Sequence, residues 1–314
     1  MNVSTTPLPV LAGPTAIGKS GLAVAVARRA GARILSIDSM LVYRGLDIGT
    51  DKPAADLLRE VPHDLVDIRS PGETFSAAEF LDEADAALAR ASARGERVLA
   101  VCGTPLYLRA YRDGLFEGPS ADAVLRESLE AEGEASGWSR LHDRLKGADA
   151  AAASRIHPND ARRIVRALEV IERTGRPVSE QRTQWASGPA RPVRMVVLTC
   201  PRDVLNRRID ERIDRMMGRG LLDEVRALAQ GPLARGPRQA IGYKEMLLHL
   251  EGGCSLEDAV ARIRRATRNL AKQQRTWLKR FGAEGTIDLG DLPSDSPKVV
   301  GEALRLLGWE RSGC

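Results

Sequence analysis

The stretch Gly13-Pro-Thr-Ala-Ile-Gly18-Lys19-Ser20 matches the phosphate-loop pattern G-x-x-x-x-G-K-[ST]. The apolar run Pro9–Ala12 precedes it and the helical pattern Leu22–Arg29 follows it, which is the strand, turn and helix that the motif requires. Glycines let backbone N–H groups close around phosphate, the lysine neutralises phosphate oxygens, and the serine hydroxyl can bind Mg²⁺. We therefore predict a phosphate-binding loop here; the alternative is a glycine-rich turn that matches by chance.

Further apolar runs place this loop in a parallel sheet. Arg33–Ile37, Arg97–Cys102 and Val193–Thr199 are short apolar runs, Thr286–Leu289 is a further strand candidate, and Ala77–Arg94 is a long Ala-rich helix. Strands that alternate with helices predict parallel pairing. The expected fold class is α/β, with a P-loop NTPase-like parallel sheet core, a helical insertion domain and a basic C-terminal helical region.

The strand pattern is interrupted between residues 121 and 180, where helical stretches follow one another. Ser179–Pro192 is polar and contains proline, which predicts a linker back to the sheet. We therefore divide the chain into a first part of the core at 1–117, a helical insertion at 118–190 and a second part of the core at 191–314.

The composition excludes several classes of protein. The net charge of +5 is modest and does not by itself imply nucleic acid. The four cysteines lie far apart, so neither a zinc site nor a disulfide framework is indicated. No apolar run approaches a membrane span, and Met1–Pro9 lacks the pattern of a signal peptide. We expect a cytoplasmic monomer without membrane attachment.

The stretch Arg262–Arg280 is basic and has a helical pattern, with eight Lys or Arg and no acid. Its apolar face, expected to pack on the core, consists of Ile263, Ala266, Leu270 and Trp277. The opposite face suits a phosphate backbone, with surface solubility as the alternative. This cationic stripe consists of Arg264, Arg268, Lys272, Arg275 and Lys279.

A phosphate loop alone does not name the reaction. Nucleotide-binding enzymes with such a loop usually carry an acid at the end of another core strand, where it supports Mg²⁺. Arg97–Cys102 ends in Gly103 and Thr104 without an acid, and the best strand-end carboxylate is Asp38. The loop can therefore hold a diphosphate that acts as a leaving group, with Asp38 available for proton transfer.

Six motifs in order resemble those of the tRNA dimethylallyltransferase (isopentenyltransferase) family, over nearly the whole chain. They are the phosphate loop, Asp38–Thr50, Gly103–Tyr107, Ile156–Glu169, Ala240–Lys244 and Thr267–Trp277. Some positions depart from the family pattern. Leu41 stands where a glutamine is expected near the target base, Cys102 replaces a usual glycine, and Ile17 and Ser20 replace Ser and Thr, although Ser20 keeps the hydroxyl.

The resemblance implies transfer of a dimethylallyl group from dimethylallyl diphosphate to N6 of adenosine 37 of tRNA, with release of diphosphate and with Mg²⁺ as cofactor. Lys19, the loop N–H groups and Ser20 with Mg²⁺ would stabilise the leaving diphosphate. Asp38 would accept the proton of the amine. The insertion and the cationic stripe would bind the anticodon stem-loop of the tRNA.

By the same resemblance, Thr104 lies near the reaction centre, Arg166 near the diphosphate or the target base, and Arg126 against RNA. Catalysis is assigned to Asp38, Thr104 and Lys19. Diphosphate or nucleotide binding is assigned to Gly13, Pro14, Thr15, Ala16, Ile17, Gly18, Lys19, Ser20 and Arg166, and metal binding to Ser20. Binding of tRNA is assigned to Asp38, Ser39, Met40, Leu41, Thr104, Arg126, Arg162, Arg163, Arg166, Arg268 and Lys272.

These residues have structural alternatives. Asp38 can cap a strand end or hold the waters of Mg²⁺, and Thr104 can cap the helix that follows it. The arginines at 162, 163 and 166 can form a solvated helix face, with Asp160 as the cap of that helix. Three rival functions also stay open: a small-molecule kinase, a prenyltransferase acting on free adenine nucleotides, and a nucleotide-gated RNA-binding protein without transfer chemistry.

Overall fold

The computed structural model describes residues 6–115, 118–119, 121–181, 191–290 and 292–310. The first residues of Met1–Pro9, on which the expectation of no signal peptide rests, lie outside these ranges, as does most of the predicted linker Ser179–Pro192. The described chain forms two compact units, Asp113–Ala190 and the remainder, Met1–Arg112 with Arg191–Cys314. No helix in the described ranges is long and apolar enough to span a membrane.

The larger unit is built on a six-stranded sheet in the order β3-β2-β4-β1-β5-β6. Every strand pair is parallel, as the sequence predicts. The strands are nearly continuous apolar runs because helices cover both faces of a parallel sheet. Their bounds are β1 Leu8–Ala12, β2 Ala32–Ile37, β3 His63–Asp64, β4 Arg97–Cys102, β5 Val193–Thr199 and β6 Gly285–Asp288.

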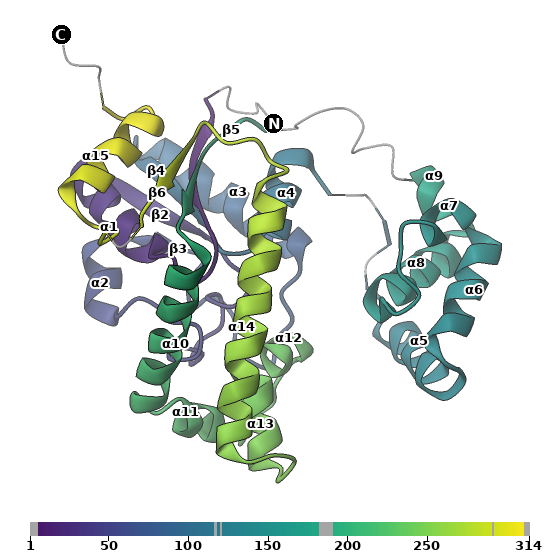
Figure 1. Cartoon of the computed structure of the whole chain (residues 1–314). Helices are drawn as coiled ribbons and strands as arrows, with labels where there is room; N and C mark the ends of the chain where they lie inside the picture. Colours follow the sequence, from purple (N-terminus) through teal and green to yellow (C-terminus); the bar gives the residue numbers. More distant parts are fainter. Residues whose placement is uncertain (1–5, 116–117, 120, 182–190, 291, 311–314) are drawn as a thin grey trace. The chain divides into compact units, whose positions relative to one another are not determined.

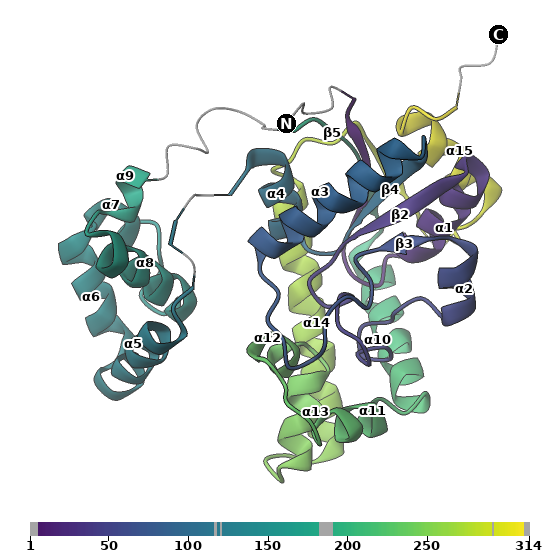
Figure 2. The same ribbon diagram turned by 180° about the vertical axis from the view of Figure 1, so that it is seen from behind.

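Helices α1 and α15 lie together on one face of the sheet, and α3 covers the other face (Figures 1 and 2). Helix α3 begins with a capping box in which Ser76 and Glu79 satisfy each other's backbone N–H groups. Parallel strands end at a common edge, so the segments after β1, β2 and β4 meet there. The bounds are α1 Lys19–Ala30, α2 Ala55–Glu60, α3 Ala77–Ala93, α4 Pro105–Asp113 and α15 Pro297–Leu306.

Between β5 and β6 the chain is helical, and α10 and α14 run side by side (Figures 1 and 2). The sequence predicts one helical stretch from Asn206 to Ala229; the structure has two helices, because Gly220 adopts a φ of 92° and starts a new one. The bounds are α10 Arg202–Gly218, α11 Leu221–Leu228, α12 Arg235–Gln239, α13 Tyr243–Leu250 and α14 Leu256–Leu278.

The predicted core face of α14 is wrong except at Ile263. Ala266, Leu270 and Trp277 are only partly buried, and a neighbouring face of the helix is turned inward. That face includes two buried polar residues, Thr267 and Gln274, which a search for apolar periodicity does not find. Its buried members are Ala259, Ile263, Thr267, Ala271, Gln274 and Leu278.

The smaller unit, Asp113–Ala190, is all helical in its described residues. It has a hydrophobic core of its own, which includes Leu141, Leu145 and Ile164. The expected insertion began at residue 118 and ended at residue 190. Its helices are α5 Ala123–Ser136, α6 Trp138–Ala148, α7 Ala150–Ala153, α8 Ala161–Thr174 and α9 Val178–Gln181.

Candidate active site

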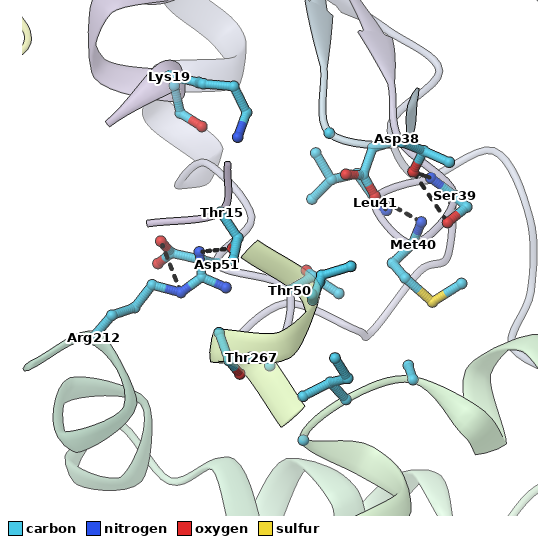
Figure 3. Close-up of a pocket in the computed structure, with 18 of the residues that line it drawn as sticks. Thr15, Lys19, Asp38, Ser39, Met40, Leu41, Thr50, Asp51, Arg212 and Thr267 are labelled. Carbon is cyan, nitrogen blue, oxygen red and sulfur yellow. Dashed lines mark hydrogen bonds and ion pairs between the residues drawn. The ribbon is translucent and has the colours of Figure 1, made fainter. Parts of the chain in front are cut away.

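A cavity of about 340 Å³ opens in the larger unit where the phosphate loop, the segments after β2 and β4, and helices α10 and α14 come together. Figure 3 shows Lys19, Thr15 and Arg212 on the left of this cavity and Asp38, Ser39 and Met40 on the right. Thr15, Lys19 and Ser20, assigned to diphosphate, and Asp38, assigned to proton transfer, therefore line one space, whereas Arg166, also assigned to diphosphate, does not. The assigned residues that line the cavity are Thr15, Lys19, Ser20, Asp38, Ser39, Met40, Leu41 and Thr104.

The phosphate loop joins β1 to α1. Gly18 has a φ of 98°, and Ala16 has a φ of 62°, so the backbone curls through the left-handed region before the helix starts. The side chain of Ile17 is buried in the hydrophobic core, which leaves only its backbone for a ligand. This curled backbone at a helix N-terminus is the geometry that binds phosphate.

Lys19 is the cation of this loop. Its Nζ donates hydrogen bonds to the carbonyl oxygens of Gly13 at 3.0 Å and Pro14 at 2.8 Å. Burial lowers the pKa of Lys19 to about 8, and the nearby charge of Asp38 opposes this shift. A diphosphate in the cavity would favour the charged form in the same way.

Asp38 follows β2 and faces the turn after β4. Its Oδ1 accepts hydrogen bonds from the backbone N–H groups of Met40 at 2.8 Å and Leu41 at 3.3 Å. A Cβ at position 103 would clash with Oδ2 of Asp38, so any residue other than glycine there would push the carboxylate out of this position. The carboxylate is thus held by its own turn on one oxygen and rests against Gly103 with the other.

Thr104 binds the Asp38 turn through its side chain. Its Oγ1 accepts a hydrogen bond from the N–H of Ser39 at 3.0 Å and donates to Oγ of Ser39 at 3.3 Å. This contact joins the segments after β2 and β4. Burial raises the pKa of Cys102, directly before this turn, to about 12, so its thiol brings no charge into the site at neutral pH.

The side chain of Leu41 lines the cavity. Its backbone carbonyl accepts a hydrogen bond from the N–H of Asp67, which ties the segment after β2 to the segment after β3. Asp47 and Asp67 both form ion pairs with the buried Lys52. The backbone around Leu41 is therefore fixed from two sides, and only its apolar side chain faces a ligand.

Arg212 of α10 is a site residue that sequence reasoning missed. Its Nη1 donates to Oγ1 of Thr15 at 3.0 Å, and its Nε lies 3.8 Å from a carboxylate oxygen of Asp51 (Figure 3). Burial lowers the pKa of this guanidinium, while Asp51 and Asp38 oppose the shift. Arg212 lies at helical spacing from the buried Ile209 and Met216, and a charge on an apolar face was the available signal.

A clamp holds the segment that carries Asp51. The carboxylate of Glu224 accepts hydrogen bonds from three consecutive N–H groups, those of Asp47, Ile48 and Gly49, at 2.7 to 3.1 Å. It also accepts one from the hydroxyl of Tyr243 at 2.7 Å. The sequence gives no signal for this clamp, because its partners lie far apart along the chain.

The cationic stripe of α14 is partly neutralised by acids that lie outside the stretch Arg262–Arg280. Arg268 pairs with Asp210 at 2.6 Å, and Arg264 pairs with Asp214. Both carboxylates lie on α10, which packs along α14. In the described part of the chain, no carboxylate lies within ion-pair distance of Lys272. Ion pairs with acids on another helix cannot be predicted from the sequence of the basic helix alone.

Two of the four arginines assigned in the insertion converge on a buried carboxylate. Arg126 forms two hydrogen bonds of 2.9 Å with Glu169, and Nη1 of Arg166 lies 2.5 Å from the same group. Arg162 and Arg163 are exposed on α8, whose N-cap is Asp160, as expected. These contacts lie within the insertion, so the roles of the four arginines toward RNA or diphosphate stay predictions.

Comparisons with known proteins identify the family. A family model described as IPP transferase matches residues 41–281. The chain is 46% identical to the tRNA dimethylallyltransferase of Symbiobacterium thermophilum, covering 96% of this chain and 95% of the other. For that of Alkalilimnicola ehrlichii the identity is 48%, with 88% of each chain covered.

Solved structures agree with this assignment. The full-length tRNA isopentenylpyrophosphate transferase of Bacillus halodurans matches with a TM-score of 0.70 at 39% identity and 96% of each chain covered. A eukaryotic dimethylallyltransferase acting on tRNA matches with a TM-score of 0.79 at 26% identity, over 96% of this chain and 78% of the other. The chain therefore belongs to the IPP transferase family.

Proposed function

We propose that this protein transfers a dimethylallyl group from dimethylallyl diphosphate to N6 of adenosine 37 of tRNA, as a cytoplasmic monomer. One observation carries the proposal: a phosphate loop with Lys19 and Arg212 shares a cavity with the carboxylate of Asp38. Relatives named tRNA dimethylallyltransferase support the donor and the acceptor.

The cations of the cavity act on the donor. Lys19, the N–H groups of the loop and Arg212 neutralise the charge that develops on the diphosphate as its bond to the allylic carbon breaks. Because Arg212 and Lys19 are partly withdrawn from water, each is worth more to a developing anion than an exposed cation. Diphosphate leaves with the electron pair of the broken C–O bond.

Asp38 acts on the acceptor. The amine of adenine uses its electron pair to form the new C–N bond, and it then carries one proton too many. The carboxylate of Asp38 accepts that proton, which keeps the alkylated amine neutral. The hydrogen bonds to Met40 and Leu41 hold the carboxylate in place before the substrate arrives.

The site fits Mg²⁺ held largely by the diphosphate itself. The hydroxyl of Ser20 lines the cavity beside Lys19 and can contribute one ligand. The described residues contain no group of three His, Cys, Asp or Glu that could hold a metal ion. Mg²⁺ usually keeps several waters and binds through few protein groups plus substrate phosphates, so the ligand set suits it. When bound, the ion would neutralise part of the diphosphate charge.

The acceptor is proposed to be tRNA and not a free nucleotide. Support comes from cations outside the cavity: Lys272 on α14, and Arg162 and Arg163, which are exposed on α8 of the insertion. A free nucleotide needs only the cavity, whereas an extended polyanion can contact these exposed groups as well. Ser39, Met40 and Thr104 line the cavity on the Asp38 side and are proposed to meet the target base.

Labelled dimethylallyl diphosphate incubated with unmodified tRNA, followed by nucleoside analysis, tests the proposal. The expected product is N6-dimethylallyladenosine at position 37, with no ATP turnover. A parallel reaction with AMP is the control for the free-nucleotide reading. Efficient transfer to AMP, phosphate transfer from ATP, or tight tRNA binding without transfer would each support one of the rival functions.

A further inference from the structure

Gln274 joins two parts of the cavity that the chain places far apart. It lies on the buried face of α14 and is 5% exposed. Its Oε1 accepts a hydrogen bond from the backbone N–H of Thr15 at 2.8 Å. Its Nε2 donates one to the carbonyl oxygen of Gly103 at 2.6 Å. One side chain thus connects the phosphate loop to the turn after β4.

The glutamine amide fits both partners in hydrogen-bonding type and in length. The N–H of Thr15 only donates and the carbonyl of Gly103 only accepts, so the bridging group must do both. A carboxylate cannot donate and an ammonium group cannot accept, whereas the glutamine amide does each at one end. Both hydrogen bonds run to backbone atoms, so they hold the course of the chain and not merely a rotamer.

One end of the bridge contacts the phosphate loop, and the other contacts the turn beside Asp38. Thr15 belongs to the diphosphate loop, and its hydroxyl also accepts the hydrogen bond from Arg212. Gly103 lies directly against the carboxylate of Asp38, with no space for even a Cβ between them. The amide of Gln274 therefore connects the loop that carries Lys19 to the turn that lies against Asp38.

The same helix carries exposed cations of the stripe. Lys272 lies two residues before Gln274 and is exposed, while Gln274 points inward. A helix is a rigid element, so a shift of α14 caused by RNA at its outer face would also move the residues on its inner face.

We propose that Gln274 is a positioning residue that couples tRNA binding along α14 to the geometry of the diphosphate loop and Asp38. The inference rests on the proposed function for the identity of the two ligands. Coupling is reciprocal: tRNA tightens diphosphate binding, and diphosphate tightens tRNA binding by the same factor. Gln274 itself touches neither reacting atom.

The test measures binding without chemistry, using inorganic diphosphate as an unreactive probe. Its Kd is determined with Mg²⁺ present, alone and with saturating unmodified tRNA, for the parent, Gln274→Met and Gln274→Asn. Gln273→Met is the matched control, because Gln273 is an exposed glutamine on the same helix. Methionine keeps the length without hydrogen bonds, and asparagine keeps the amide but is too short to reach both partners.

We expect tRNA to tighten diphosphate binding at least about fivefold in the parent, the lower range of allosteric coupling. In both Gln274 variants the factor should fall to near one, with the Kd for tRNA alone within about twofold and kcat reduced about tenfold or more, which is the cost of misplaced reacting groups. Gln273→Met should behave like the parent. The asparagine variant keeps the test decisive if the methionine variant does not fold.

Coupling that survives in a folded Gln274 variant, or is absent in the parent, overturns the proposal. So does an equal loss in Gln273→Met. These outcomes are separate from failure of the proposed function, which appears as a parent that binds both probes but transfers no dimethylallyl group to tRNA.

Discussion

The cavity and the cationic stripe both present lysine and arginine, but in opposite surroundings. In the cavity, burial lowers the pKa of Lys19 and of Arg212, although the carboxylates of Asp38 and Asp51 oppose this shift. On α14, Arg268 has 43% of its side chain exposed and is balanced by Asp210. A charge withdrawn from water interacts strongly with a developing anion, whereas an exposed, paired charge is screened. The cavity should therefore govern the rate, and the stripe should govern affinity for RNA.

Asp38→Asn is expected to have the largest effect. Asparagine keeps the shape and the contacts to the turn but cannot accept a proton at neutral pH. The single-turnover rate should fall on the order of 10²–10⁴ while tRNA affinity stays near that of the parent. A rate within about threefold of the parent, far below a general-base effect, would mean that the proton goes elsewhere.

Lys19→Ala should reduce transfer by about 10²–10³, because it removes a cation that meets developing charge. Binding of tRNA should change little, since Lys19 contacts the loop and not the outer surface. Rates at saturating tRNA, with filter binding of tRNA in parallel, check both halves. Near-normal turnover would contradict the assignment of the phosphate loop to diphosphate. It would also contradict the proposal that the cavity governs the rate.

The pH dependence of donor binding follows from the pKa of Lys19, lowered to about 8 from 10.5. Below pH 8 the lysine is charged and affinity for dimethylallyl diphosphate should be flat. Above it the free protein loses this charge, so affinity should fall by up to about tenfold per pH unit, and binding should take up a proton. Calorimetry in buffers of different ionisation enthalpy measures that uptake. Lys19→Ala should abolish both effects; persistence of either would assign them to another group.

In the free protein, Lys19 makes the free energy of unfolding rise with pH, whereas its effect on donor affinity falls with pH. The folded state disfavours the charged form of Lys19, so between pH 8 and 10.5 the unfolded chain binds more protons. The contribution of Lys19 to the free energy of unfolding therefore rises with pH across this window. It is a cost to stability below pH 8 that diphosphate binding offsets.

The salt dependence of tRNA binding measures how many cations of the stripe contact phosphates. With Arg264 and Arg268 paired to acids, about three of its cations remain, which gives a log–log slope of roughly −2 to −3 in place of −3 to −5 for five. Lys272→Ala should raise the KM for tRNA and make the slope shallower by up to about one unit. Arg268→Ala should do less, and the rate at saturation should stay unchanged in both.

Asp210→Asn is the matched counterpart, because it releases Arg268 and should make the slope steeper. A slope of zero in the parent would leave the stripe as an ordinary solvated surface. A larger effect of Arg268→Ala than of Lys272→Ala would mean that RNA displaces Asp210.

Leu41→Gln is expected to have the smallest effect. The leucine side chain offers no hydrogen bond, so any role toward the target base is packing. The substitution should be tolerated within a fewfold in kcat/KM, and it should favour tRNAs that relatives with glutamine prefer. Comparing kcat/KM over several purified tRNAs checks this. A large loss with the fold intact would show that this protein reads its substrate through an apolar contact.

The amino-acid sequence by itself determined the parallel α/β core and the local parts of the site. The phosphate loop, the Asp38 turn and the cap at Asp160 could be predicted because their interacting groups are neighbours along the chain, so spacing and residue type suffice. β4 and β5 were predicted to the residue, since buried parallel strands are continuous apolar runs.

Only the tertiary structure decided which distant groups meet. Arg212 with Thr15, Glu224 with the segment before Asp51, and Gln274 with Gly103 are each separated by more than a hundred residues. Apolar periodicity also predicted the wrong buried face of α14, because the face that is buried includes the polar Thr267 and Gln274. Such contacts depend on packing of whole helices against the sheet edge, which no local pattern encodes. Asp210 and Asp214, which pair with cations of the stripe, likewise meet them only because α10 packs along α14.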